Sequence, residues 1–328
     1  MRIELLDPAT GEDEVLRGWY RCRIAAARVD SADNPHLPFD LVRGQLEPDG
    51  VEHRRTWICR DAEGQVIGGV RLALPDDENR HTCDAFLIVH PDHRRRGAGR
   101  ALLQYAAARG AGARHSMSGA AMVGSPGASF AAAAGAVERL RDTRSLLRLA
   151  DVDASLLAGW SAGRGSRTDG YVLRRWRDRC PDELVEPYTR ALGAMNDAPI
   201  GGDHLPVTFD AQRLRRHEAA RAVRGQRLLV VCALAESTGE VVGLTELLLP
   251  SSGPRADQGD TAVPAARRGH GLGLWVKATM LTWLLAERPE ITEVETWNAT
   301  GNTHMRAVNA ELGFVPVEEW WNYSLALS

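Results

Sequence analysis

Apolar and polar positions along the chain follow two patterns, short apolar runs between turn residues and longer stretches with apolar residues three and four apart. The first pattern predicts buried strands and the second predicts helices. The first half therefore predicts four features. They are a helix over about 12–29, a strand pair within 54–74, a buried strand over 84–89 and a helix over 99–110 that stops at Gly110.

The second half repeats this order of elements. Asp210 is placed to cap one of its helices and Gly225 to stop it. The predicted elements are helices over 181–195 and 208–225, a hairpin over 226–249, a strand over 259–263, a helix over 271–288, a strand over 291–298, a helix over 302–313 and a strand over 320–327.

Matching residues recur at a nearly constant offset, which indicates two copies of one α+β unit. Three pairs lie 174 positions apart: Val89 and Val263, Arg94 and Arg268, Gly97 and Gly271. We predict a first domain over 1–150, a linker rich in Gly, Ser and charge over 151–170, and a second domain over 171–328.

Length and composition narrow the class of protein. A chain of 328 residues is long enough for two domains. The net charge of -3 argues against nucleic acid as a partner. No apolar run reaches the roughly 18 residues that a membrane span needs, and the acidic N-terminus lacks a signal-peptide layout. Five scattered cysteines without a C-x-x-C pair predict buried thiols in a cytoplasmic protein, with neither a metal site nor a disulfide framework.

Two glycine-rich stretches join a predicted strand to a predicted helix, "HRRRGAGRALL" (93–103) and "ARRGHGLGLWVK" (266–277). The first turn of a helix presents unsatisfied N–H groups and the positive end of the helix dipole, so it can hold an anion. Glycines let the backbone approach a phosphate closely, and neighbouring arginines add charged contacts. A Walker loop and a dinucleotide fingerprint both need residues that are missing here.

Both stretches share the pattern R-x-x-G-x-G, at 94–99 and 268–273. This pattern resembles the pyrophosphate loop of the GCN5-related N-acetyltransferase (GNAT) superfamily, and "WNATGNTHMRAVNAELGF" (297–314) resembles the family's later strand and helix. A tandem pair is similar to bacterial two-domain members such as mycothiol synthase. The resemblance implies an α+β fold of two tandem GNAT-like domains, each with a mixed, mostly antiparallel central sheet flanked by helices.

The resemblance also implies acetyl-CoA, or another short acyl-CoA, as cofactor. The strands before the loops would then bind the pantetheine arm, and an amine would reach the thioester across a splay between two central strands. The residues expected to contact the cofactor are Ile88, Val89, Arg94, Arg95, Arg96, Gly97, Ala98, Gly99, Arg100, Ala262, Val263, Arg268, Gly269, His270, Gly271, Leu272, Gly273, Asn298 and Asn302.

The second half keeps more polar groups for chemistry. Glu246 lies in an apolar strand, where a carboxylate suits a general base, although it could instead face outward from an edge strand. Asn309, the second candidate for the catalytic site, stands where the family often has a tyrosine that acts as the general acid, and Ala131 stands there in the first half. Neither side chain can act as an acid. The strand that matches Glu246 has Arg71 as its only charge.

We therefore expect an N-acyltransferase that acts by direct attack, with a small-molecule amine as acceptor and the second half as the active copy. Two alternatives stay open, a non-catalytic acyl-CoA sensor or scaffold and an active first half. The sequence assigns no oligomeric state.

Overall fold

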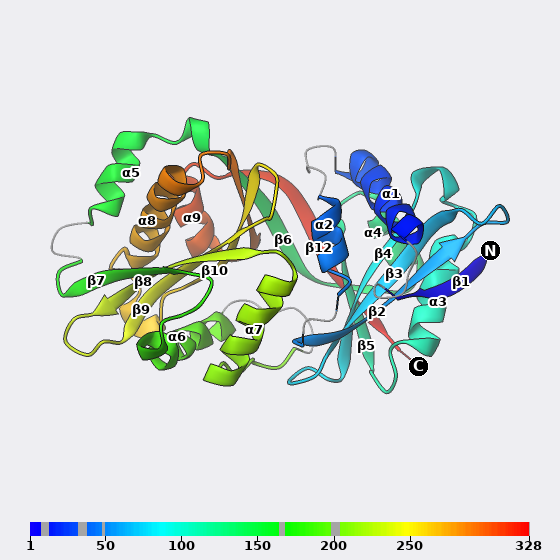
Figure 1. The fold of residues 1–328 in the computed structure, drawn as a ribbon, viewed down its shortest axis with the longest axis horizontal. Helices are drawn as coiled ribbons and strands as arrows, with labels where there is room; N and C mark the ends of the chain where they lie inside the picture. The colour runs from blue at the N-terminus through cyan, green and yellow to red at the C-terminus, as the bar shows by residue number, and fades with distance from the viewer. Residues whose placement is uncertain (8–12, 32–37, 48–49, 164–167, 198–203, 328) are drawn as a thin grey trace. The chain divides into compact units, whose positions relative to one another are not determined.

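A computed structural model describes residues 1–7, 13–31, 38–47, 50–163, 168–197 and 204–327. The chain divides into two compact units, each built on a sheet with helices (Figure 1). The first consists of Met1–Arg141, Gly201–Leu205 and Glu319–Ser328, and the second of Asp142–Ile200 and Pro206–Glu318.

The first unit has strand order β1-β2-β3-β4-β5-β12. Helix α1 packs on one face of this sheet, and α3 packs on the other within a separate apolar cluster. The elements of the first sequence half are β1 (Arg2–Leu6), α1 (Asp13–Asp30), α2 (Phe39–Gly44), β2 (Glu52–Arg60), β3 (Val66–Pro75), β4 (Thr82–Val89), α3 (Ala98–Arg109), β5 (Ser116–Met122), α4 (Pro126–Ala133) and β6 (Val137–Arg148).

The second unit has strand order β6-β11-β10-β9-β8-β7. One apolar cluster gathers around α8 and another around α6 and α7. Its elements are α5 (Ala154–Ser161), β7 (Tyr171–Arg177), α6 (Val185–Leu192), α7 (Ala211–Val223), β8 (Arg227–Ala235), β9 (Val241–Leu249), β10 (Arg255–Ala262), α8 (Leu272–Glu287), β11 (Glu293–Ala299) and α9 (Thr303–Glu311), and β12 (Val315–Ala326) ends the chain.

This arrangement confirms the α+β fold and the helices predicted from apolar spacing. Asp210 caps α7 by accepting the backbone N–H of Arg213, and Gly225 follows the helix with a positive φ of 67°. Strands β8 and β9 are buried on both faces, which explains their continuous apolar sequence. Among the residues that the structure describes, no helix is long and apolar enough to cross a membrane.

The two units exchange the strands that end each half of the sequence. β6 pairs antiparallel with β11, from Arg148↔Glu293 to Asp142↔Ala299. β12 pairs antiparallel with β5, from Trp320↔Met122 to Ala326↔Ser116. The division therefore falls within β6, after Arg141, nine residues before the predicted end of the first domain at residue 150.

The segment predicted as a linker contributes a helix to the core of the second unit. Asp153 caps α5, whose Leu157 is buried, and the indole N–H of Trp275 on α8 donates to the carbonyl of Ser161 at 3.1 Å. Small and polar residues around these anchors make the sequence resemble a linker, although residues 164–167 of that prediction lie outside the described part of the chain.

The exchange predicts that residues 1–150 do not fold as an independent unit. Without β12, the backbone of β5 loses its partner along Ser116–Met122, and unpaired strand edges are costly when buried. We expect the fragment to show no cooperative thermal transition by circular dichroism, whereas the full chain does. A cooperative transition in the isolated fragment would contradict the exchange.

Candidate functional site

The central strands of each unit separate after three paired residues. β4 and β5 run parallel from Thr82↔Ser116 to Asp84↔Ser118. β10 and β11 do so from Arg255↔Glu293 to Asp257↔Glu295. The structure describes every residue of these four strands. Beyond the three pairs, β4 does not pair further with β5, and β10 does not pair further with β11. Each unit therefore presents a free backbone edge along which an extended ligand can hydrogen-bond as an added strand.

The glycine-rich loops lie at the end of β4 and of β10, and they have the same backbone geometry. Gly97 caps α3 with φ of 88°, and Gly271 caps α8 with φ of 76°. Two residues earlier, Arg95 and Gly269 also have positive φ, 62° and 84°. The shared left-handed positions support a common origin of the two copies, because only a small part of φ/ψ space gives this loop.

The loops present backbone donors that the rest of the described chain does not use. No described residue accepts a hydrogen bond from the backbone N–H groups of 95–99 or of 269–273. Such groups at a helix start, together with the helix dipole, form an anion site. Arg95, Arg96 and Arg100 expose their side chains around the first loop. Both loops therefore suit a phosphate group, and the first is the more positive.

The first arginine of each motif braces its loop instead of standing free for an anion. The Arg94 Nε donates to the Val89 carbonyl at 3.1 Å, and its two terminal nitrogens donate to Asp30 at 2.7 and 2.6 Å. Arg268 repeats this arrangement with the Val263 carbonyl at 3.0 Å and Asp197 at 2.7 Å. The guanidinium groups of Arg94 and Arg268, both predicted as cofactor contacts, thus tie each loop to the strand before it and to a carboxylate.

The loops differ in what covers their second glycine. A Cβ on Gly99 would lie 3.3 Å from the ring of Phe130 on α4, whereas a Cβ on Gly273 would meet only Val263, at 3.8 Å. In the second loop, the ring nitrogen Nδ1 of His270 lies 3.2 Å from the Arg267 carbonyl. His270 therefore bonds its own loop.

A bulge in β10 places two residues opposite Glu246. The register with β9 changes between Gln258 and Thr261, so that Gly259 and Asp260 share one position along the ladder. A Cβ on Gly259 would lie 3.1 Å from the Cβ of Glu246. Burial and the neighbouring Glu246 carboxylate raise the pKa of Asp260 to about 6, despite an opposing effect of Arg221.

Glu246 lies on an interior strand and is only 4% exposed, which excludes an outward-facing position on a sheet edge. The Tyr188 hydroxyl donates to its Oε1, and the Arg221 Nη2 lies 3.5 Å from its Oε2. Burial and the Glu246 carboxylate raise the pKa of Tyr188 well above its usual value, so Tyr188 remains protonated. The carboxylates of Glu246 and Asp260 thus form a pair on the sheet face covered by α6 and α7.

The first unit has no carboxylate at the matching place. Arg71 occupies the position of Glu246, and Phe86 that of Asp260. The guanidinium groups of Arg71 and Arg23 lie 5.4 and 4.7 Å from the Phe86 ring centroid, and Trp19 packs edge-on against the same ring. Cations and aromatic rings therefore fill the position at which the second unit carries the carboxylate pair.

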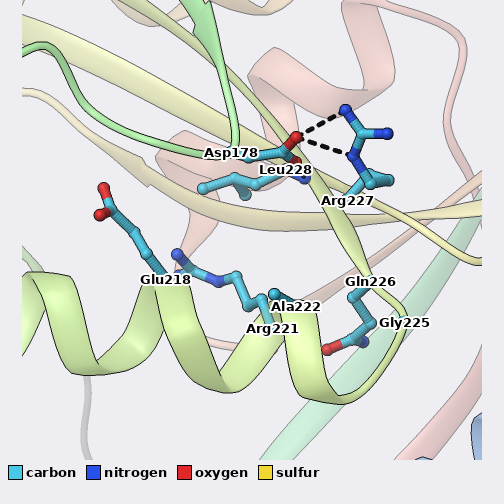
Figure 2. Close-up of a pocket in the computed structure, with 8 residues that line it drawn as sticks. All are labelled: Asp178, Glu218, Arg221, Ala222, Gly225, Gln226, Arg227 and Leu228. Atoms are coloured by element: carbon cyan, nitrogen blue, oxygen red, sulfur yellow. Dashed lines mark hydrogen bonds and ion pairs between the residues drawn. The ribbon is translucent and has the colours of Figure 1, made fainter.

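A hollow of about 250 Å³ opens between the end of α7 and the start of β8 (Figure 2). Within it Arg227 is paired with Asp178 at 2.6 Å, while Arg221 reaches from the hollow toward Glu246. The hollow is lined by Asp178, Glu218, Arg221, Ala222, Gly225, Gln226, Arg227 and Leu228. A small molecule held there would lie on the same face as the carboxylate pair.

The asparagines predicted around the second site have structural partners. Asn302 caps α9, because its side chain accepts the backbone N–H of Met305 at 3.2 Å. Asn309 is 3% exposed and its amide donates to the Asn298 Oδ1 at 2.7 Å. An amide is no proton donor to a leaving group, so neither its chemistry nor its burial supports a catalytic role for Asn309.

Lys277 is a buried charge that the sequence motifs do not single out. It is the only lysine of the chain and stands on α8, 2% exposed. Its Nζ donates to the Gln258 Oε1 at 2.9 Å and lies 5.3 Å from the Phe314 ring centroid. Burial lowers its pKa to about 7. The sequence signal for this buried lysine was a single charged residue within an otherwise largely apolar helix.

The burial of Lys277 predicts a pH-dependent cost to stability. Below pH 7 the lysine is charged in both folded and unfolded chains, so the full cost is present. Between its folded pKa of about 7 and its unfolded value of 10.5, only the unfolded chain stays protonated, so stability rises with pH. We expect Lys277→Met to raise the melting temperature by several degrees at pH 6 and by less at pH 9. An equal gain at both pH values would contradict the lowered pKa.

Comparison with known proteins identifies the fold. Residues 19–121 match the family described as Acetyltransferase (GNAT) family. A tandem GNAT protein from the clavulanic acid biosynthesis pathway is 29% identical with a TM-score of 0.83, and the match covers 100% of this chain and 98% of that one.

A GCN5-related N-acetyltransferase from Sphaerobacter thermophilus is 15% identical with a TM-score of 0.69, covering 99% of this chain and 95% of that one. No curated protein matches. The chain carries an acetyltransferase domain of the GNAT family and has, over its whole length, the fold of a tandem GNAT protein.

Proposed function

We propose that the second unit transfers an acetyl or similar short acyl group from CoA to an amine of a small molecule. The observation that carries the proposal is the Glu246–Asp260 carboxylate pair beside the β10 bulge, at the point where β10 and β11 separate. The unpaired strand edge supports binding of an extended pantetheine arm, and the N–H groups of 269–273 support binding of its pyrophosphate.

Each group has a distinct task in this proposal. CoA, when bound, supplies a thioester carbon for direct attack. Asp260 is partly exposed, so it meets the acceptor ammonium first and takes its proton, while Glu246 is held in place by Tyr188 and Arg221. A carboxylate with a pKa of about 6 is ionised at neutral pH and still basic enough to accept that proton. No covalent enzyme intermediate is needed.

A small acceptor is supported by the hollow that Arg221 and Gln226 line (Figure 2). Its volume of about 250 Å³ suits a metabolite-sized group rather than a protein surface. The similar tandem GNAT protein belongs to the clavulanic acid biosynthesis pathway, which also favours a small metabolite as acceptor. The five cysteines are all free and buried, in keeping with work in the cytoplasm.

For the first unit we propose acyl-CoA binding without chemistry. Its loop has the same geometry and more exposed arginines, but Arg71 and Phe86 replace the carboxylate pair. This copy would act as a structural partner or an acyl-CoA sensor. Acyl transfer by the second unit and ligand binding by the first are compatible within one chain.

Replacing the proton acceptor should remove turnover and leave donor binding intact. We expect Asp260→Asn to lower kcat for thiol release by about 10²–10⁴-fold, because a neutral amide cannot take the proton. The control is Glu240→Gln, which changes an exposed carboxylate in the turn between β8 and β9. Acetyl-CoA affinity, measured by calorimetry, should stay the same in both variants. Full turnover by Asp260→Asn would exclude Asp260 as the base.

The same carboxylate predicts the acidic limb of the pH profile. Asp260 accepts a proton only when ionised, and its pKa is about 6, so kcat/KM should fall as the pH drops through 6. Stopped assays between pH 5 and 8 with a saturating acyl donor test this expectation. A rate that is flat down to pH 5 would count against a base with that pKa.

A further inference from the structure

Lys277 sits where the two central strands of the second unit separate. Its acceptor, Gln258, is the first residue of β10 beyond the last pair with β11, Asp257↔Glu295. The Gln258 amide in turn donates to the Thr245 Oγ1 at 3.0 Å and to the carbonyl of Glu246. Lys277 is therefore connected through one side chain to the strand that carries the carboxylate pair.

Helix α9 carries a second buried polar group with unused bonding capacity, linked to Lys277 through Phe314. The Asn309 Oδ1 is buried and has no partner among the described residues. Its backbone carbonyl accepts the N–H of Phe314 at 3.0 Å, and the Phe314 ring lies 5.3 Å from the Lys277 Nζ. A buried ammonium with three N–H donors and one polar acceptor is costly, so a functional reason for keeping it is worth testing.

Resting on the function proposed above, we propose that the Lys277 ammonium donates the proton that the leaving sulfur of the acyl donor receives. The acceptor amine attacks the thioester carbon, the C–S bond breaks, and its electron pair moves to sulfur as Lys277 gives up a proton. The acceptor ammonium loses two protons in total. One passes through the carboxylate pair to solvent, and the other returns Lys277 to its charged form.

The surroundings of Lys277 suit this role. Helix α5, which packs against α8, has no titratable side chain. On β9 and β10, Glu246 and Asp260 face α6 and α7, on the opposite side of the sheet from α8. Burial alone lowers the pKa of Lys277, to about 7. A thiol such as that of cysteine has a pKa of about 8.5, so the proton moves from nitrogen to sulfur downhill.

The matching residue of the first unit is Leu103, which is apolar and packs in the core around α3. The copy without a carboxylate pair thus also lacks the buried amine. The carboxylate pair and the buried amine therefore occur together in the second unit, as expected if they are the base and the acid of one reaction.

Because the chain has one lysine, labelling the full-length protein with ε-¹³C-lysine gives a single NMR signal for Lys277. We expect this signal to titrate near pH 7 in the free protein. With CoA bound, part of the lysine signal should stay charged above about pH 8, where the thiol ionises, because a thiolate beside the ammonium favours the charged form. Desulfo-CoA, which lacks only the sulfur atom, should not produce this effect.

Identical lysine titrations with CoA and desulfo-CoA would overturn the inference. If calorimetry detects no CoA binding at all, both the inference and the proposed function fail. A third outcome separates the two. If CoA binds and Gly271→Glu abolishes this binding, but the lysine signal is the same with CoA and desulfo-CoA, only the inference fails.

Kinetics provide the second readout. Lys277→Met and Lys277→Arg should each lower kcat by about 10²–10⁴-fold at unchanged KM for the acyl donor, the arginine because it is too weak an acid. Leu103→Met, the matched change in the first unit, should leave kcat unaltered. Full activity of Lys277→Arg would show that positive charge alone suffices, which contradicts proton donation.

Discussion

Strands β10 and β11 are joined by three residue pairs and then separate, and this separation is the constraint on which the second unit depends. Backbone groups that leave a ladder inside a protein need other partners. Helix α8 packs on one face of the sheet here, the bulge at Gly259 and Asp260 interrupts the ladder with β9, and the strand edge stays free for a ligand. The loop, the bulge and the buried lysine are all arranged around this opening.

The two copies keep the loop and differ in the chemistry beside it. Left-handed backbone at Gly97 and Gly271 and the paired arginines behind them preserve the same cradle. The opposite sheet face has diverged completely, with cations and an aromatic ring in the first unit and a carboxylate pair in the second. A shared loop geometry beside two different sheet faces is what duplication followed by divergence would leave.

Local sequence patterns predicted the elements whose signals are local. The helices, the Asp210 cap and the place of each glycine-rich loop between a strand and a helix depend on neighbouring residues, and these predictions are confirmed. The exchange of β6 and β12 depends on pairing between residues more than 140 positions apart, such as Arg148 with Glu293, which no local pattern encodes. Helix α5 was also missed, because its segment is rich in small and polar residues. Only one buried leucine and an N-cap residue anchor the helix.

The site was predictable in outline and not in its details. Glu246 stood out as a charge in an apolar strand, but Asp260 becomes its neighbour only through a bulge. Arg94 and Arg268 carried the motif, yet their partners Asp30 and Asp197 come from distant helical segments, so their bracing role required the fold. The burial of Lys277 likewise depends on packing against Phe314.

The central claim, that the second unit performs the chemistry, is tested most directly by the rate of thiol release from acetyl-CoA in the presence of an amine panel. The rate should be compared among the intact protein, Gly97→Glu and Gly271→Glu, since a glutamate in either loop repels and blocks a pyrophosphate. We expect Gly271→Glu to abolish thiol release and Gly97→Glu to leave most of it. Loss of release with Gly97→Glu and full activity with Gly271→Glu would instead assign the chemistry to the first unit.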